Sequence, residues 1–100
     1  MAAIDPSTLI LSSLAGGPKH GYAITQDVLA VADVTLGPGT LYGAIARLED
    51  RGYIKALPGD ERRRPYELTA QGAAVLAAEA QRMQRVARTT LGRLAIGVAP

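Results

Sequence analysis

The stretch that most limits the folds open to this chain is GPGTLYGAIARLEDRGYI, at residues 37–54. A Gly-Pro-Gly turn leads into a run whose apolar side chains recur at helical spacing on one face, at Leu41, Ile45 and Leu48. A second strip on the same helix is expected to be exposed and consists of Thr40, Ala44, Arg47 and Arg51. Gly52 is well placed to end the helix. The pattern predicts a helix that packs through one side and leaves a polar strip on the other.

Two further helices and a short strand are expected before this stretch. The first helix begins at Asp5-Pro6-Ser7, where Asp can cap and Pro is tolerated, and it ends before Gly16. The second covers about residues 20–32, with apolar side chains spaced along one face. The brief segment 33–36 is β-prone, so we expect a short strand there.

A hairpin and a long helix are expected after it. Residues 53–57 and 65–68 are typical of two strands joined by a polar turn, and Thr69 can cap a last helix that continues to about residue 94. Three helices followed by a hairpin predict a winged helix-turn-helix in a mainly α, α+β chain. We expect the DNA-binding domain at 1–69 and a dimerisation helix at 70–100.

The last helix carries a heptad pattern that favours pairing with another helix. Its members are spaced 4, 3, 4, 3, 4 and are Leu76, Ala80, Met83, Ala87, Thr90 and Leu94. The chain has 100 residues and no Phe or Trp, so its core is built from small side chains. Chains with so small a core are commonly stabilised by forming oligomers, and the heptad pattern predicts a dimer.

The polar strip at 37–54 has the features of a helix that reads DNA. Its N-terminus presents unpaired N–H groups that favour a phosphate, and Gly39 leaves room for close approach. Thr40 can bond a phosphate or a base, and Arg47 can reach a phosphate or a guanine. An ordinary amphipathic helix with a solvated face would show the same strip.

Charge and aromatic residues elsewhere add to this interpretation. Arg62-Arg63-Arg64 lies at the hairpin turn, where guanidinium groups suit a phosphate backbone or a narrow groove, although a solvated charged turn is the alternative. The formal net charge of +2 is mildly basic.

Three residues near the expected helix starts could also take part. Tyr22 and Tyr42 are each expected to be half-buried, and a phosphate contact by their hydroxyls is the more specific hypothesis. His20, beside a helix start, is more often a cap than a ligand.

Several classes of function are disfavoured. With no Cys and one His, the chain offers no cluster for a transition metal and no disulfide, and a cytoplasmic location fits. Its acidic residues show no acid–base pairing and its serines lack a plausible base, so we expect no enzyme and no cofactor. The N-terminus lacks the pattern of a signal peptide, and no apolar run is long enough to span a membrane.

At this spacing the motifs closely resemble the PadR family of bacterial transcriptional regulators. The resemblance extends from about Leu9 to Leu76. The residues that carry it are His20-Gly21-Tyr22, Pro38-Gly39-Thr40-Leu41-Tyr42, Arg47-Leu48-Glu49, Gly52, Leu68-Thr69 and Gly72.

The resemblance implies a homodimeric repressor that binds palindromic promoter DNA, and in many relatives a small aromatic effector releases the DNA. The residues expected to contact DNA are Lys19, His20, Tyr22, Pro38, Gly39, Thr40, Tyr42, Arg47, Arg62, Arg63 and Arg64. The first helix is expected to help the last one form the dimer, so the expected interface comprises Leu11, Leu76, Ala80, Met83, Ala87, Thr90 and Leu94.

Three departures from the family pattern bear on these expectations. Gly43 stands where Pro is frequent, and Pro65 stands where a basic or polar residue is common. The absence of Trp excludes stacking of an effector between tryptophans. Two rival hypotheses keep the fold and change the partner: a winged helix that binds protein, and a small-molecule sensor with weak affinity for DNA.

Overall fold

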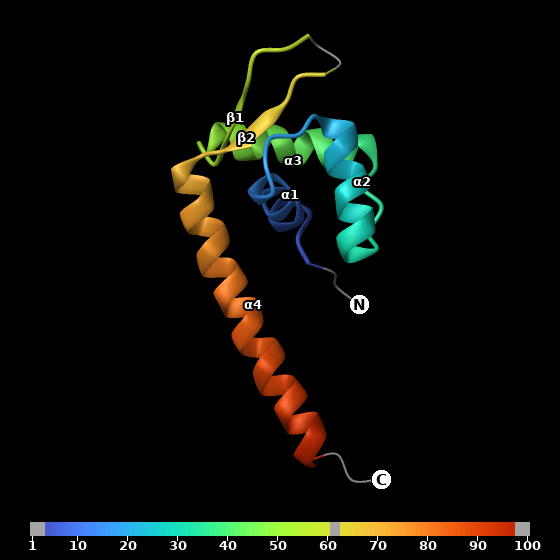
Figure 1. Ribbon diagram of the computed structural model, residues 1–100, viewed down its shortest axis with the longest axis vertical. Coiled ribbons are helices and arrows are strands. Elements are labelled where there is room, and N and C mark those ends of the chain that lie inside the picture. Colours follow the sequence, from blue (N-terminus) through green and yellow to red (C-terminus); the bar gives the residue numbers. More distant parts are fainter. Residues whose placement is uncertain (1–3, 61–62, 98–100) are drawn as a thin grey trace.

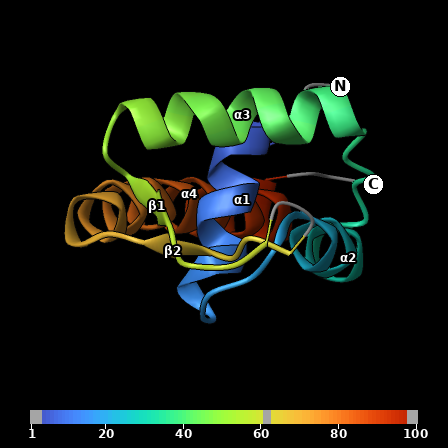
Figure 2. The same ribbon diagram turned by 90° about the horizontal axis from the view of Figure 1, so that it is seen from above.

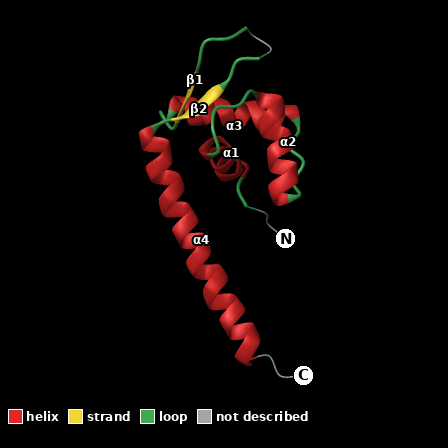
Figure 3. Ribbon diagram, in the orientation of Figure 1, coloured by secondary structure: helices red, strands yellow, loops and turns green. Residues whose placement is uncertain are grey.

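The computed structural model describes residues 4–60 and 63–97, which form four helices and a small antiparallel sheet. In chain order the elements are α1 (Pro6–Ala15), α2 (Gly21–Ala32), α3 (Pro38–Asp50), β1 (Ile54–Ala56), β2 (Tyr66–Leu68) and α4 (Ala70–Gly97). The first three helices pack with the sheet, and α4 extends away from them, which makes the molecule 57 × 26 × 19 Å (Figures 1 and 3). The predicted mainly α, winged helix-turn-helix class with an added C-terminal helix is confirmed.

Local capping explains where the first two helices begin. The Asp5 carboxylate accepts the backbone N–H of Ser7 at 2.9 Å, and Pro6 occupies the first turn, where no helical hydrogen bond is lost. His20 caps α2, because its Nδ1 accepts the backbone N–H of Ala23 at 3.4 Å. The expected start of α1 and the capping role of His20 are therefore confirmed.

The core lies where α1, α2 and α3 meet. Ile10, Ile24 and Ile45 are its largest fully buried side chains, one from each helix. Burying a side chain of this size stabilises the fold by roughly 1.5–3 kcal/mol. Ala44 is also fully buried, at 0% exposure, so its assignment to the exposed strip was wrong. Around the helix it lies about 40° beyond Leu48, on the side away from Ile45. α3 therefore buries a wider face than Leu41, Ile45 and Leu48 alone suggest.

Residues 33–36 do not form the expected strand; they cross from α2 to α3 without regular structure. Leu36 is buried and Val34 packs against the core, so the segment is apolar for packing rather than for pairing. The place beside β2 is taken by Lys19, whose backbone N–H donates to the Tyr66 carbonyl at 3.2 Å and whose carbonyl accepts the Tyr66 N–H at 2.9 Å. The β-propensity at 33–36 therefore had no neighbouring strand to satisfy it.

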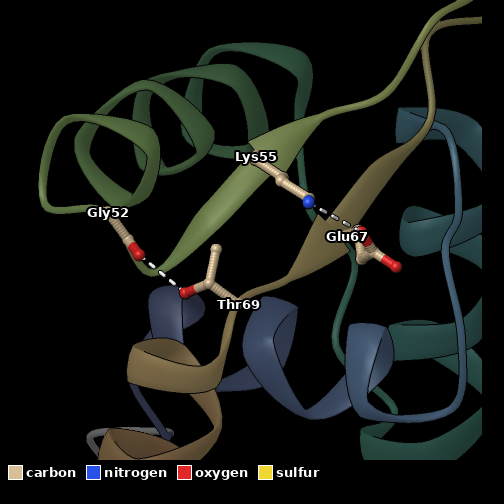
Figure 4. Close-up of polar contacts among 4 residues, drawn as sticks. All are labelled: Gly52, Lys55, Glu67 and Thr69. Carbon is tan, nitrogen blue, oxygen red and sulfur yellow. Dashed lines mark hydrogen bonds and ion pairs between the residues drawn. The ribbon is translucent and has the colours of Figure 1, made fainter.

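The hairpin is shorter than expected. β1 and β2 pair antiparallel with Ile54 opposite Leu68, Lys55 opposite Glu67 and Ala56 opposite Tyr66. Outside the strands, the Leu57 N–H still donates to the Pro65 carbonyl at 2.8 Å. Lys55 and Glu67 form a cross-strand ion pair at 3.5 Å (Figure 4). Both side chains are largely exposed, so the pair contributes at most about 1 kcal/mol.

α4 is held to the rest of the molecule by its first turns. Among the described residues of α4, Gly72 is the one that is buried, and Leu76 packs against the core. The helix continues to Gly97, slightly beyond the expected end near residue 94. Within the described part of the chain, no helix is long and apolar enough to cross a membrane.

A substitution at Asp33 tests the backbone strain at the end of α2. Asp33 has φ 56°, in the left-handed region that a side chain disfavours, and its carboxylate lies at the negative end of the helix dipole. We expect Asp33→Gly to raise the free energy of unfolding by about 0.5–1 kcal/mol in urea denaturation. Asp33→Ala removes the charge and keeps the strain, so an equal gain from Ala would contradict the strain argument.

Candidate nucleic-acid interface

α3 and the hairpin share one end of the molecule. Seen from above, α3 and the two strands both face the viewer, while α4 runs away beneath them (Figure 2). Figure 1 shows that the hairpin loop projects beyond α3 at the end opposite to the far tip of α4. A partner that approaches this end can therefore touch the outer face of α3 and the hairpin loop together.

The N-terminus of α3 is open to a ligand. Its N-cap residue, Gly37, has no side chain that could cap the helix. Pro38, Gly39 and Thr40 are all exposed in the first turn. The N–H groups of this turn thus remain available to a phosphate, as the sequence predicted.

The outer face of α3 is made of small side chains with larger ones beside them. At 100° per residue, Gly39, Gly43 and Ala46 follow one another along the line opposite the buried face. Tyr42 flanks this line with 51% exposure. Arg47 flanks it on the other side and lies close to Gly43, since a Cβ added at Gly43 would be 3.6 Å from Nη1 of Arg47. The backbone of α3 can therefore come unusually close to whatever binds there.

Gly21 positions Tyr42. A Cβ added at Gly21 would lie 2.5 Å from the Tyr42 hydroxyl oxygen and 3.0 Å from its Cζ, so the ring rests directly over the glycine. Gly21 is buried by this contact at the start of α2. The first two sequence motifs are thus joined in space, because the glycine of the His-Gly-Tyr motif makes room for the tyrosine that flanks the outer line of α3.

Tyr22 and Lys19 have different surroundings. Tyr22 is 65% exposed, more than expected, and its hydroxyl accepts a hydrogen bond from Nε2 of Gln26 at 2.9 Å. The Lys19 ammonium is half-buried and donates to the carbonyls of Ser13 and Gly17 at the end of α1. A cation is favourable at the C-terminus of a helix. Lys19 therefore closes α1, a role that its position after Gly-Gly-Pro could have indicated.

The hairpin loop presents Arg63 and Arg64, both exposed, whereas Arg62 lies outside the described residues. The Asp60 carboxylate accepts the backbone N–H of Arg63 at 2.9 Å. A Cβ added at Gly59 would lie 3.0 Å from Pro65 Cδ, so the two sides of the loop are in close contact. Asp60 thus shapes the turn that carries the arginines.

Tyr66 belongs to β2, and its hydroxyl is influenced by two residues of α3. Burial raises the pKa of its hydroxyl, and the negative charge of Glu49 and the neighbouring Tyr42 raise it further, while Arg64 lowers it. The hydroxyl therefore stays protonated at neutral pH and can donate a hydrogen bond. Glu49 also places a negative charge beside this surface, which limits how strongly the C-terminal half of α3 can attract a phosphate.

An apolar groove runs along the side of α4, and we call it the tail groove. It has a volume of about 740 Å³ and is lined by Ile4, Glu79, Arg82, Met83, Val86, Ala87, Thr90 and Leu91. Of the expected dimer interface, the groove contains Met83, Ala87 and Thr90, and Leu94 is 55% exposed beyond it. Ala80 is exposed. The structure puts Leu11 in the chain's own core and packs Leu76 against that core, so both have little surface left for a partner.

Comparisons with known proteins identify the family of this chain. The model of the "Transcriptional regulator PadR-like family" matches residues 10–78. The solved structure of a transcriptional regulator from Clostridium thermocellum, Cth-833, is similar with 32% identity and a TM-score of 0.75, over 87% of this chain and 90% of that one. A PadR family transcription regulator from hypervirulent Clostridium difficile R20291 has 29% identity and a TM-score of 0.77, over 88% of this chain and 96% of that one.

A longer relative is also similar in sequence. An uncharacterized 37.1 kDa protein in transposon TN4556 of Streptomyces fradiae is 45% identical over 82 residues, which are 82% of this chain. The match spans 24% of that protein's length.

A double-mutant cycle tests the contact between Gly21 and Tyr42. Gly21→Ala forces the Tyr42 ring away from α2, so we expect the free energy of unfolding to fall by about 1–2 kcal/mol. In a Tyr42→Ala background the obstacle is gone, and most of this cost should disappear. Chemical denaturation of the four proteins measures the coupling. Equal costs of Gly21→Ala in the two backgrounds would show that the ring does not rest there.

Proposed function

This chain belongs to the PadR-like family of transcriptional regulators, and we propose that it is a repressor that binds palindromic promoter DNA as a homodimer. The observation that carries the proposal is the arrangement at one end of the molecule. α3 and the hairpin, whose loop carries the exposed Arg63 and Arg64, lie at the same end of the molecule (Figure 2), and α4 leaves in the opposite direction (Figure 1). A cytoplasmic protein that covers promoter DNA in this way blocks access to it.

In this proposal α3 enters the major groove. Its uncapped first turn, with Pro38 and Gly39, receives a phosphate, and Thr40 bonds the phosphate or a neighbouring base. Tyr42 and Arg47 flank the outer line and reach the groove edges, where the forked donors of Arg47 suit a guanine. The small side chains between them let the helix sit deep enough for these contacts.

The other expected contacts lie around α3. Arg63 and Arg64, together with Arg62, bind the backbone from the hairpin loop. Tyr22 donates its hydroxyl to a phosphate from the start of α2. Lys19 and His20 contribute mainly by holding that start in place, because Lys19 bonds the end of α1 and His20 caps α2.

The tail groove supports a dimer. Val86 and Leu91, which line it, are 60% and 67% exposed, which is costly for an isolated helix in water. A second copy that lays its own α4 along this face would cover them and create a two-fold axis. Two-fold symmetry of the protein then matches two-fold symmetry of the operator. The same apolar groove is wide enough for a small aromatic effector, which would act by changing how the two copies pair.

Selection of bound sequences from random double-stranded DNA tests the proposal. We expect a palindrome whose half-sites are about one helical turn apart, or a multiple of that distance. Enrichment of a motif without symmetry would contradict a dimer that reads two half-sites. Failure to enrich any sequence would favour the rival in which this winged helix binds protein.

The double variant Arg63→Ala, Arg64→Ala tests the role of the hairpin loop. Because phosphate contacts carry no sequence information, we expect weaker binding to the selected DNA and to unrelated DNA alike. The plot of log affinity against log salt should lose up to about two units of slope. Arg85→Ala, Arg88→Ala removes the same charge from α4 and should leave affinity and slope unchanged in gel-shift titrations. Equal losses from both pairs would point to net charge rather than to contacts.

The substitution Met83→Glu tests the dimer. It introduces a charge into the tail groove. We therefore expect a monomer in sedimentation at micromolar concentration, where we expect the unmodified chain to be a dimer. Gln81→Glu adds the same charge about 200° away around α4 and should leave the dimer intact. A dimer that survives Met83→Glu would place the interface elsewhere.

A further inference from the structure

We propose that Thr69 and Gly72 form a rigid joint that fixes the angle between α3 and α4 and so sets the distance between the two DNA-reading helices. The second half of this statement rests on the proposed dimer, whereas the first half concerns a single chain. The joint comprises Gly52 and Tyr53, which follow α3, together with Thr69 and Gly72, which begin α4.

Thr69 bonds both sides of the joint through one hydroxyl. Its Oγ1 donates to the Gly52 carbonyl at 2.6 Å (Figure 4) and accepts the Gly72 backbone N–H at 3.0 Å. The Thr69 backbone N–H also donates to the Tyr53 carbonyl at 3.1 Å. The residue that caps α4 is therefore also bonded to the two residues that leave α3.

Gly72 brings the two backbones into direct contact. A Cβ at this position would lie 2.0 Å from the Tyr53 carbonyl oxygen and 2.8 Å from its carbonyl carbon. These are backbone atoms, which cannot turn aside as the end of a long side chain can. Any larger residue at position 72 must therefore push the first turn of α4 away from Tyr53.

The other side of the joint is equally fixed to α3. Gly52 has φ 77°, its N–H donates to the Glu49 carbonyl at 3.0 Å, and the Tyr53 N–H donates to the Leu48 carbonyl at 3.0 Å. These two bonds close the end of a helix in the usual glycine-terminated way. Gly52 and Tyr53 thus move with the last turn of α3, and Thr69 ties them to the first turn of α4.

A small change at this joint becomes large at the far end of α4. The helix has 28 residues, and beyond Met83 its described residues are all exposed. A displacement of about 1 Å over the first turn tilts the helix by about 10°, which moves its end by about 7 Å. In a dimer that pairs through α4, the same tilt shifts the two α3 helices relative to each other. Half-sites on DNA have fixed spacing, so the joint selects which spacing is bound.

The bonding of Thr69 separates this role from ordinary capping. A cap needs an acceptor for the Gly72 N–H, which Asp supplies as well as Thr. The bond to the Gly52 carbonyl needs a donor, which ionised Asp lacks and Ser retains. Thr69→Asp should thus keep the helix cap and break the joint, whereas Thr69→Ser should keep both.

Distances between spin labels test the joint in the whole chain. The sequence has no Cys, so Asp50→Cys on α3 and Arg88→Cys on α4 give two unique labelling positions, both exposed. Labelled chains are diluted with unlabelled ones, so that pulsed electron resonance measures distances within one chain. We expect one narrow distribution for the parent and for Thr69→Ser, and a broader or shifted one for Thr69→Asp. Gly72→Ala should shift the distance by up to about 4 Å, because Arg88 lies about 24 Å along α4 from position 72.

The outcomes separate the joint from the proposed function. Parent-like distances in Thr69→Asp would overturn the joint, and this variant keeps the test valid if Gly72→Ala fails to fold. The single label Asp50→Cys, undiluted, measures the separation between subunits. This separation should change in Thr69→Asp and should equal that of the parent in Thr69→Ser. If no distance between subunits is detected, the proposed dimer fails while the joint within one chain stands.

Discussion

The structure depends on the burial of one side of α3. Leu41, Ala44, Ile45 and Leu48 hold this helix on α1 and α2, so the opposite side is free for a partner. Because the chain has no Phe or Trp, the core consists of small aliphatic side chains that gain their stability from close packing. Residues without a side chain also allow close contacts at the edges of the core. Tyr42 can cross to α2 because Gly21 has no side chain, and the first turn of α4 can touch Tyr53 because Gly72 has none.

The charges are arranged so that DNA binding would depend on geometry more than on net charge. The chain carries only +2 overall, and Glu49 and Asp50 end α3. The open N-terminus of α3 and the exposed Arg47, Arg63 and Arg64 provide positive groups at the proposed interface. The arginines of α4 lie along the helix that points away from it (Figure 1). A molecule of this kind gains affinity when several weak contacts fit one duplex at once.

Features set by neighbouring residues could be predicted from the sequence, and features set by distant contacts could not. Asp5, His20 and Gly52 mark helix ends through bonds within a few residues, and the alternation at 66–68 marks a strand. The strand predicted at 33–36 does not form for a different reason. A strand needs a neighbour, and Lys19 already occupies the position beside Tyr66. Leu11 fits either a core or an interface by pattern alone. Gly72 belongs to the family motif, but the need for glycine at this position could not be predicted, because it comes from a contact with Tyr53, far away in sequence.

In the proposed dimer, the small side chains on the outer face of α3 make the distance between the two subunits important. Gly39, Gly43 and Ala46 allow close approach but offer few groups that distinguish one base pair from another. In the proposed function, direct reading falls to a few flanking residues, chiefly Thr40, Tyr42 and Arg47, which would recognise a short half-site. A short half-site occurs often by chance, so discrimination must come from requiring two of them at one spacing. That requirement is only as strict as the connection between α3 and α4 is rigid. The backbone contact of Gly72 and the two hydrogen bonds of the Thr69 hydroxyl hold that connection. Such a connection suits a regulator whose α3 offers few groups that distinguish base pairs.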